Sequence, residues 1–239
     1  MADLKGKVAV VTGSTKGIGR AIAEALVRAG CNVAVSSRHA DDAEKTAQEL
    51  TATGPGRAIG RACDVQDEAQ CTDMIAETVL AFGRLDILVN NAGIGAFGPV
   101  ADMEPQTWRN VLRTNLDGVF YCTHAALPHL KRAKGAWIFN IASLAGKNPF
   151  PGGAAYNASK FGLVGFSEAL MQEVRQDDIR VSYIMPGSVA TEFSHPQSGS
   201  GDAWKIQPED IGQIVMDLLT MPPRTLPSRV EVRPSKPGK

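Results

Sequence analysis

The feature of this sequence that most constrains its fold is the alternation of short apolar runs with longer segments of helical periodicity. The apolar runs predict strands at Val8–Val11, Asn32–Ser36, Arg57–Ala62, Asp86–Val89, Ala136–Ile141 and Arg180–Met185. The remaining periodic segments predict helices at Gly17–Gly30, Asp41–Leu50, Asp67–Phe82, Thr107–Arg132 (interrupted or ended near Pro128), Ala154–Gln176 and Pro208–Leu219. Strands that alternate with helices favour a parallel sheet covered on both faces, and right-handed crossovers make it doubly wound. We therefore predict one Rossmann-type α/β domain over residues 1–239, with a parallel sheet of about seven strands.

Composition limits the functional classes. Lys+Arg and Asp+Glu both number 25, so the net charge is zero, whereas a nucleic-acid-binding protein normally carries a basic excess. No apolar run approaches the roughly 18 residues of a membrane helix, and the first residues lack the apolar stretch of a signal peptide. We expect a cytoplasmic protein without nucleic-acid or membrane partners. Cys31, Cys63, Cys71 and Cys122 form no Cys-x-x-Cys pair and no zinc-ligand spacing with histidine, which predicts separate thiols and no metal site.

Two segments depart from the regular alternation. Gly187–Gly201 is rich in serine and glycine and lies between a predicted strand and a predicted helix, so we expect a substrate lid loop over residues 187–207. Residues 234–239 combine proline and lysine, and we expect a flexible tail.

A glycine-rich turn joins the first strand to the first helix. Gly13 lets the chain turn sharply, Gly17 lets a phosphate approach the backbone, and Gly19 lets the helix pack close to the sheet. Free amides at the helix start attract a pyrophosphate. The spacing differs from the G-x-x-x-x-G-K-[ST] loop of nucleotide triphosphatases, so a dinucleotide is favoured. A purely structural glycine turn is the alternative.

The residues at the end of the second strand indicate whether the adenosine ribose of the cofactor carries a 2′-hydroxyl or a 2′-phosphate. An acidic residue there would bond a ribose 2′-hydroxyl, but the strand ends in Ser36, Ser37 and Arg38. Arg38 and Lys16 suit a 2′-phosphate, since a guanidinium bonds two phosphate oxygens. We interpret this as NADP(H) over NAD(H). Alternatively both are solvated surface charges, and Asp41 and Asp42 could partly offset Arg38.

A tyrosine and a lysine share one helix face further along the chain. Tyr156 and Lys160 are four residues apart, and the ammonium should favour the phenolate and so lower the pKa of Tyr156. Tyr156 could then exchange a proton near neutral pH. Ser143 follows the strand Ala136–Ile141, where its hydroxyl could donate to a carbonyl oxygen that gains negative charge. Each residue alone would be an ordinary core tyrosine, surface lysine or loop serine.

Seven motifs follow one another along most of the chain. They are Thr12-Gly-Ser-Thr-Lys-Gly-Ile-Gly19, Asp64-Val65, Asn90-Asn-Ala-Gly93, Asn115, Ser143, Tyr156-x-x-x-Lys160 and Pro186-Gly-Ser-Val-Ala-Thr191. In this order the chain resembles the short-chain dehydrogenase/reductase superfamily, and most closely its β-ketoacyl-(acyl-carrier-protein) reductase-like members.

The resemblance implies the following site. Tyr156 is the general acid in carbonyl reduction, Lys160 lowers its pKa and holds the nicotinamide ribose, Ser143 polarises the substrate carbonyl, and Asn115 holds a water of the proton relay. The cofactor NADP(H) is bound by Gly13, Thr15, Lys16, Gly17, Ile18, Gly19, Ser37, Arg38, Asp64, Val65, Asn91, Ala92, Gly93, Tyr156, Lys160, Pro186, Gly187, Val189 and Thr191. The expected reaction converts a ketone or 3-oxoacyl compound, with an acyl thioester as one such substrate, into a secondary alcohol.

Apolar residues near these motifs are candidates for substrate selection. Leu144, Phe150, Phe193 and Phe97 suit an acyl or other hydrophobic carbonyl compound, although they could equally be packing residues. Phe161 and Phe166 on the predicted helix Ala154–Gln176 are interpreted as core.

The C-terminal segment departs from the family. Its members often end in a buried strand and a glycine pair that packs on a neighbouring subunit. Here Arg229, Glu231 and Arg233 alternate with valines, which predicts an edge strand with one charged face, and Pro234 would hinder further pairing. The resemblance implies a homodimer through the helices Thr107–Arg132 and Ala154–Gln176, or a homotetramer, which the charged strand makes doubtful.

The same residues allow three other functional interpretations. A reductase of other small ketones or aldehydes fits the same motifs. A regulatory protein that binds the dinucleotide without turnover would have no chemical need for Asn115, Ser143, Tyr156 and Lys160 together. A serine hydrolase is disfavoured because the chain has no G-x-S-x-G elbow around Ser143.

Overall fold

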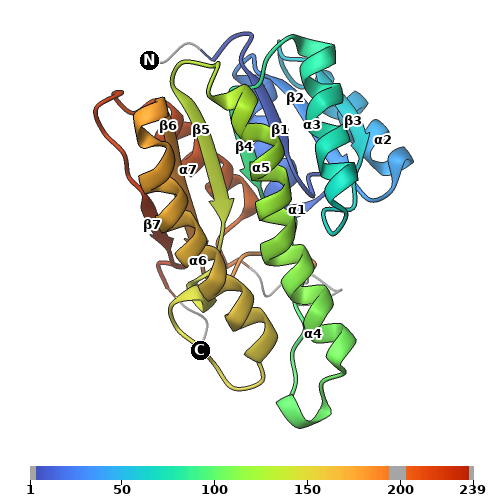
Figure 1. Cartoon of the computed structure of the whole chain (residues 1–239), viewed down its shortest axis with the longest axis vertical. Coiled ribbons are helices and arrows are strands. Elements are labelled where there is room, and N and C mark those ends of the chain that lie inside the picture. The colour runs from blue at the N-terminus through green and yellow to red at the C-terminus, as the bar shows by residue number, and fades with distance from the viewer. Residues whose placement is uncertain (1–3, 194–202, 237–239) are drawn as a thin grey trace.

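A single sheet of seven parallel strands forms the centre of the molecule. The computed structural model describes residues 4–193 and 203–236. The strand order is β3-β2-β1-β4-β5-β6-β7, and every pairing is parallel. The strands are β1 (Val8–Val11), β2 (Asn32–Ser37), β3 (Ala58–Ala62), β4 (Ile87–Asn90), β5 (Ala136–Ile141), β6 (Ile179–Pro186) and β7 (Arg229–Val232). The predicted doubly wound α/β architecture is confirmed (Figure 1).

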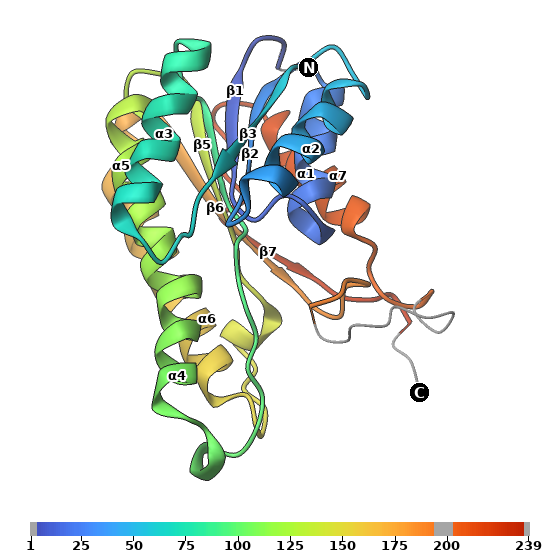
Figure 2. The same ribbon diagram turned by 90° about the vertical axis from the view of Figure 1, so that its right-hand side faces the viewer.

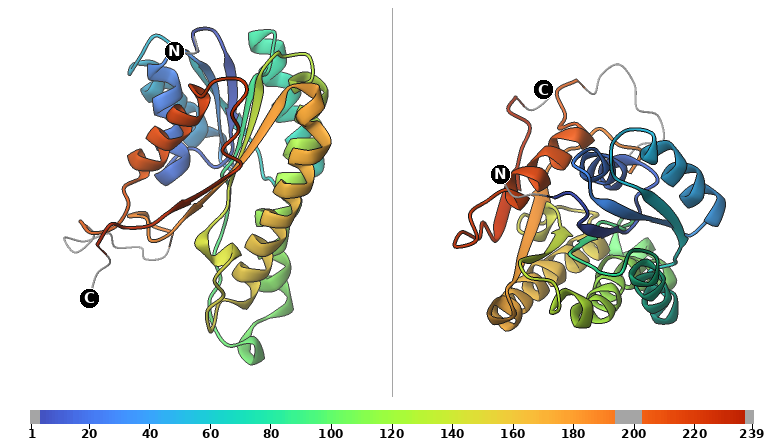
Figure 3. Two further views of the ribbon diagram at one scale, coloured as in Figure 1. Left: turned by 90° about the vertical axis from the view of Figure 1, so that its left-hand side faces the viewer. Right: turned by 90° about the horizontal axis from the view of Figure 1, so that it is seen from above.

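Two layers of helices enclose this sheet (Figure 2). One face is covered by α1 (Gly17–Arg28), α2 (Ala40–Thr51) and α7 (Pro208–Leu219), and the view from above in Figure 3 shows α1 beside α7. The other face is covered by α3 (Glu68–Phe82), α5 (Gly118–Leu130) and α6 (Ala154–Val174), while α4 (Pro105–Leu112) extends beyond the sheet.

The central strands β1, β4 and β5 are largely apolar because both of their faces are buried. Along β1, Ala9 and Val11 contribute to the core under α1 and α7, whereas Val8 and Val10 contribute to the core under α3 and α5. Alternate residues of one strand therefore fill two different cores, which explains why the sequence shows continuous apolar runs rather than polar–apolar alternation.

The helix predicted over Thr107–Arg132 is wrong in two respects. The chain is already helical from Pro105, and residues Arg113–Asp117 form a π-helical segment between α4 and α5. Pro128 lies inside α5, which continues to Leu130. A proline removes one donor near the helix end, and its exposed position lets water satisfy the carbonyl that loses its partner.

The predicted charged edge strand is confirmed. β7 pairs with β6 alone among the described strands, and Glu231 lies at its centre. Lys147 Nζ is 2.9 Å from Glu231 Oε1, Arg233 Nη2 is 2.9 Å from Glu231 Oε2, and Arg229 also bonds this carboxylate. Lys147 and these two arginines lower the pKa of Glu231 to about 2.

No helix of the described chain is long and apolar enough to cross a membrane.

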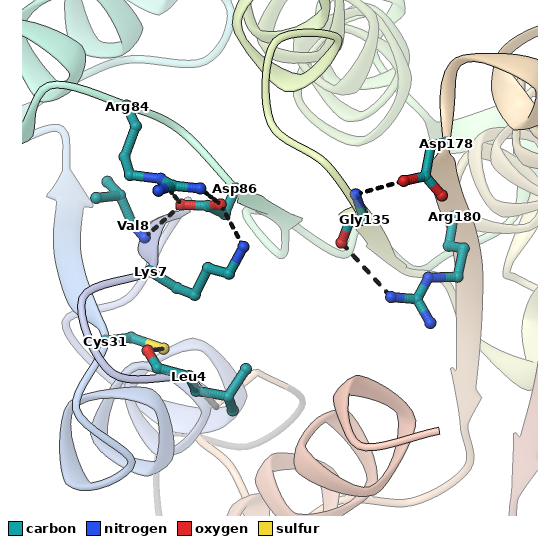
Figure 4. Close-up of polar contacts among 9 residues, drawn as sticks. All are labelled: Leu4, Lys7, Val8, Cys31, Arg84, Asp86, Gly135, Asp178 and Arg180. Atoms are coloured by element: carbon teal, nitrogen blue, oxygen red, sulfur yellow. Dashed lines mark hydrogen bonds and ion pairs between the residues drawn. The ribbon is translucent and has the colours of Figure 1, made fainter. Parts of the chain in front are cut away.

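A buried carboxylate joins the amino ends of β1 and β4 (Figure 4). Asp86 is 2% exposed and accepts bonds from Arg84, from Lys7 Nζ at 2.9 Å and from the Val8 amide at 3.0 Å. On the same edge, the Gly135 amide donates to Asp178 Oδ2 at 2.8 Å, and Arg180 lies over the Trp137 ring. Burial of Asp86 would raise its pKa, but the donated hydrogen bonds outweigh burial and hold the pKa below its ordinary value.

Asp86→Asn is expected to destabilise the protein by about 1–3 kcal/mol at neutral pH, because it removes the charge that pairs with Lys7 and Arg84. The pKa of Asp86 is lower in the folded protein than in the unfolded chain, so its charge stabilises the fold above about pH 4. This stabilisation is lost as the pH falls through the pKa of Asp86 in the folded protein. Urea unfolding at pH 7 and pH 3 should therefore give a large difference from wild type at pH 7 and a smaller one at pH 3. Exposed Asp102→Asn is the control, and equal effects of both substitutions would contradict the assignment.

Candidate active site

A cleft of about 1180 Å³ opens at the carboxyl ends of the strands. It brings together the predicted site residues Gly13, Thr15, Lys16, Gly17, Ile18, Ser37, Arg38, Asp64, Val65, Asn91, Ala92, Gly93, Ser143, Leu144, Phe150, Tyr156, Lys160, Pro186, Gly187, Val189, Thr191 and Phe193. Phe97 also lines the cleft. Gly19 and Asn115 do not line the cleft. Gly19 packs against Asn91 and Asn115 bonds Ile94, and both of these neighbours do line it. Residues from seven segments thus meet where a doubly wound fold places its ligands.

The glycine turn is shaped by close backbone packing. Gly13 has φ +60°, and a Cβ there would lie 2.9 Å from Ala92 Cα. A Cβ on Gly19 would lie 2.4 Å from Asn91 Nδ2 and 2.5 Å from the Gly13 carbonyl oxygen. Asn91 Nδ2 donates to the carbonyls of Thr12 and Gly13, both at 2.9 Å. The turn therefore tolerates only glycine at these points and directs the start of α1 into the cleft, which fits an anionic dinucleotide.

The basic residues at the adenosine end have different surroundings. Arg38 is exposed at the end of β2 and has no hydrogen-bond or ion-pair partner within the described residues, including Asp41 and Asp42. Lys16 Nζ lies 3.0 Å from Glu192 Oε2, and both side chains are largely exposed. Arg38 is free to bind a phosphate, whereas Lys16 would first exchange its exposed ion pair, which costs little in water.

Ser143, Tyr156 and Lys160 converge at the other end of the cleft. The Ser143 hydroxyl accepts from the Ala145 amide at 3.1 Å and lies close enough to the Tyr156 hydroxyl to lower its pKa. Lys160 is 5% exposed, and its Nζ donates to the Ile141 carbonyl at 2.8 Å and lies 5.8 Å from the Tyr156 ring centre. The side chains come from the end of β5 and from one face of α6, so their convergence requires the sheet and the helix together.

The ionisation of these groups is dominated by burial. Burial raises the pKa of Tyr156, and the hydrogen bond with Ser143 offsets only part of this effect. This direction is opposite to the lowering that the sequence predicts, because burial is the largest effect on the Tyr156 hydroxyl. Burial lowers the pKa of Lys160 to about 8. At neutral pH, Tyr156 therefore keeps its proton and Lys160 remains mostly charged.

Asn115 lies in the π-helical segment and links two parts of the site. Its Oδ1 accepts from the Ile94 amide at 2.8 Å, and its Nδ2 donates to the Ile94 carbonyl at 2.9 Å and to Ser159 Oγ at 3.0 Å. Ser159 in turn donates to the Tyr156 carbonyl at 2.8 Å. The side chain of Asn115 therefore positions the loop after β4 and the first turns of α6.

Several residues of the site were not found by sequence reasoning. Asn157 Nδ2 donates to the Ala145 carbonyl at 2.7 Å and so holds the turn after Ser143 against α6. The cleft is also lined by Cys63, Gln66, Ile94, Gly95, Thr114, Ile141, Ala142, Ala145, Asn148, Glu192, Lys205 and Pro208. Trp204 lines it too, a residue whose place after the serine- and glycine-rich stretch allowed either a lid over the substrate or no special role. Position within the Tyr156–Lys160 motif could have indicated Asn157, but contacts between distant segments have no local signal.

The predicted lid and the thiols are described in part. Val189 and Ile206 form an isolated parallel bridge that closes the base of the predicted lid, and residues 194–202 lie outside the described residues. The last three residues of the predicted tail lie outside them as well.

All four cysteines are buried and free, but the Sγ atoms of Cys63 and Cys71 are 4.0 Å apart.

Comparisons with known proteins agree with this geometry. A family model described as short chain dehydrogenase matches residues 7–200. The NADP-dependent (R)-specific alcohol dehydrogenase of Lentilactobacillus kefiri is 41% identical over 200 residues, covering 82% of this chain and 79% of that protein. A putative ketoacyl reductase of Streptomyces coelicolor is 38% identical over 214 residues, covering 88% and 81%.

A solved structure extends the likeness to nearly the whole chain. It is a metagenomic short-chain oxidoreductase in complex with NADP, with a TM-score of 0.86 and 38% identity, covering 99% of this chain and 100% of that one. The family match, the sequence identities to the relatives and the shared fold all lead to the same conclusion. The chain belongs to the short-chain dehydrogenase/reductase family of oxidoreductases.

Proposed function

We propose that this protein is an NADP(H)-dependent reductase that converts a ketone of the 3-oxoacyl type into a secondary alcohol. The observation that carries the proposal is the convergence of Ser143, Tyr156 and Lys160 at one end of a cleft whose other end carries the glycine turn and Arg38. A solved relative in complex with NADP and an NADP-dependent relative support the choice of cofactor.

The residues present fit the dinucleotide. The glycine turn would hold the pyrophosphate, and Asp64 and Val65 would border the adenine. Arg38 would hold the 2′-phosphate, because this guanidinium has no competing partner among residues 4–193 and 203–236. Ser37 and Lys16 border the same end, while Pro186 and Thr191 border the nicotinamide end. When bound, the cofactor supplies the hydride.

The protein's own groups handle the proton. Tyr156, whose raised pKa keeps it protonated at neutral pH, gives its proton to the carbonyl oxygen as negative charge develops there. The Lys160 ammonium then stabilises the phenolate, and the Ser143 hydroxyl donates a second hydrogen bond to the same oxygen. Both amide donors of Asn115 already bond protein groups, so neither is open to the relay water that the family resemblance implies for this residue.

A 3-oxoacyl substrate is supported by the putative ketoacyl reductase among the relatives and by the apolar residues Leu144, Phe150 and Phe193 in the cleft. Another small ketone or aldehyde is the second candidate, which the alcohol dehydrogenase relative favours. In a non-catalytic protein, burial of the Lys160 ammonium would lower the stability of the fold without serving a reaction.

The test is the initial rate of NADPH consumption with acetoacetyl-N-acetylcysteamine, a thioester that needs no carrier protein, with NADH in parallel. We expect turnover with NADPH and little with NADH. Turnover of simple ketones alone would replace the acyl substrate by the second candidate. If NADPH binds but no carbonyl compound is reduced, the protein is a non-catalytic dinucleotide-binding protein.

A second copy of the chain is the proposed macromolecular partner, as a homodimer or homotetramer. The prediction that Phe161 is core is wrong, since it is 45% exposed on α6, and Phe120 is 49% exposed on α5. These rings leave an apolar surface on the helices named for the dimer, which supports burial against a second subunit.

A further inference from the structure

Aromatic side chains are concentrated at the substrate end of the cleft. Within the described residues, five phenylalanines are exposed by two fifths or more, and three of them line the cleft: Phe97 at 52%, Phe150 at 43% and Phe193 at 42%. Exposed rings that converge in one concave place cost free energy in water, and a bound apolar group would relieve that cost. The catalytic cleft is where such a group would bind.

The rings are arranged around Tyr156. The Phe97 ring centre lies 5.6 Å from that of Tyr156 at an interplanar angle of 67°, and the Phe193 ring centre lies 5.7 Å away at 52°. The Phe150 ring centre is 6.0 Å from that of Phe97. These distances and tilts match the arrangement that aromatic rings prefer with one another. The proposed proton donor is thus flanked by two rings from separate segments of the chain.

A glycine makes room for this arrangement. A Cβ on Gly95 would lie 2.8 Å from two atoms of the Phe97 ring and 3.1 Å from Phe193 Cε1. Gly95 therefore lies directly against both rings, and any side chain there would push them apart. The backbone itself forms one wall of the aromatic cluster.

The segment that carries Phe97 offers no cation to an anionic group. From Phe97 to Trp108 the chain contains no lysine or arginine, and it contains Asp102 and Glu104, both exposed. Of the cations that line the cleft, Lys160 is needed at the tyrosine and Arg38 at the far, cofactor end. A neutral, flat substituent matches what the segment offers.

We propose that Phe97, Phe150 and Phe193 form an aromatic pocket that selects ketones with an aryl group on the reacting carbonyl. This inference rests on the proposed reductase function and names its substrate class. Ring–ring contacts favour an aryl group over a saturated ring of the same size, because they add to the area that both would bury. Ethyl 3-oxo-3-phenylpropanoate and ethyl 3-cyclohexyl-3-oxopropanoate are a matched pair, since they differ only in that ring.

The experiment compares kcat/KM for the two esters with NADPH. We expect the wild-type protein to favour the phenyl ester by about fivefold or more, in line with the strength of aromatic pairs. Phe97→Leu and Phe193→Leu keep apolar bulk and should bring the ratio to within about twofold of unity. Phe82→Leu, on α3 away from the cleft, is the matched control and should keep the wild-type ratio.

Each other outcome overturns the inference at a different level. Turnover of both esters at equal efficiency by the wild type removes the aromatic preference and leaves the reductase function intact. A preference that survives both leucine variants shows that other residues cause it. If the wild type reduces neither ester nor the acetoacetyl thioester while it binds NADPH, the proposed function fails and the inference fails with it.

Discussion

Tyr156→Phe is expected to lower the kcat of NADPH-dependent ketone reduction by about 10³-fold, within the range for loss of a general acid. The substitution removes one oxygen atom and leaves the ring between Phe97 and Phe193 in place. The carbonyl oxygen would then lose its proton donor and keep only the Ser143 hydroxyl. NADPH affinity should stay within about threefold, because Gly13, Arg38 and the rest of the adenosine end are untouched.

Single-turnover kinetics and fluorescence titration with NADPH separate these two effects. Tyr121→Phe, on α5 outside the cleft, is the control with the same change of one hydroxyl. It should reduce ketones at the wild-type rate. If Tyr156→Phe also keeps near wild-type turnover, another group supplies the proton. If it loses NADPH binding as well, the hydroxyl serves the cofactor site rather than the reaction.

Arg38→Asp is expected to lower kcat/KM for NADPH by about 10²-fold or more, with a change of about threefold or less for NADH. Arg38 is exposed and has no partner in the part of the chain that the structure describes, so its removal leaves no unsatisfied group there. An aspartate would repel a 2′-phosphate and could bond a ribose 2′-hydroxyl instead. Loss of a charge-assisted hydrogen bond together with a new like-charge repulsion accounts for a change of this size.

The measurement is kcat/KM for both cofactors at low and high salt, since a phosphate contact weakens with ionic strength. Arg132→Asp makes the same charge change just beyond α5, outside the cleft, and serves as the control. An unchanged ratio of NADPH to NADH in Arg38→Asp would contradict the phosphate contact. Equal losses with both cofactors would mean that Arg38 supports the shared part of the dinucleotide.

Much of the architecture could be predicted because local and global preferences agree. The runs Val8–Val11 and Ala136–Ile141 are buried on both faces, so their apolar character is continuous and readable. The charged edge strand Arg229–Val232 follows from its own alternation in the same way. Features that depend on contacts with distant residues were missed. The π-helical segment at Arg113–Asp117 places Asn115 against Ile94 and Ser159, and the pattern of a helix does not reveal such a local change of pitch.

The sequence by itself determined which residue types occur at the ends of the strands, because the glycines at 13, 17 and 19 and the Tyr156–Lys160 spacing are local properties of the chain. Only the tertiary structure decided how these residues act on one another. The packing of Phe97 and Phe193 on Tyr156, the ion pair of Lys16 with Glu192, and the burial that raises the pKa of Tyr156 all join segments far apart in sequence. The strength of these interactions depends on the distance between the groups and on the exclusion of water. Both are set only once the sheet and its helices have assembled.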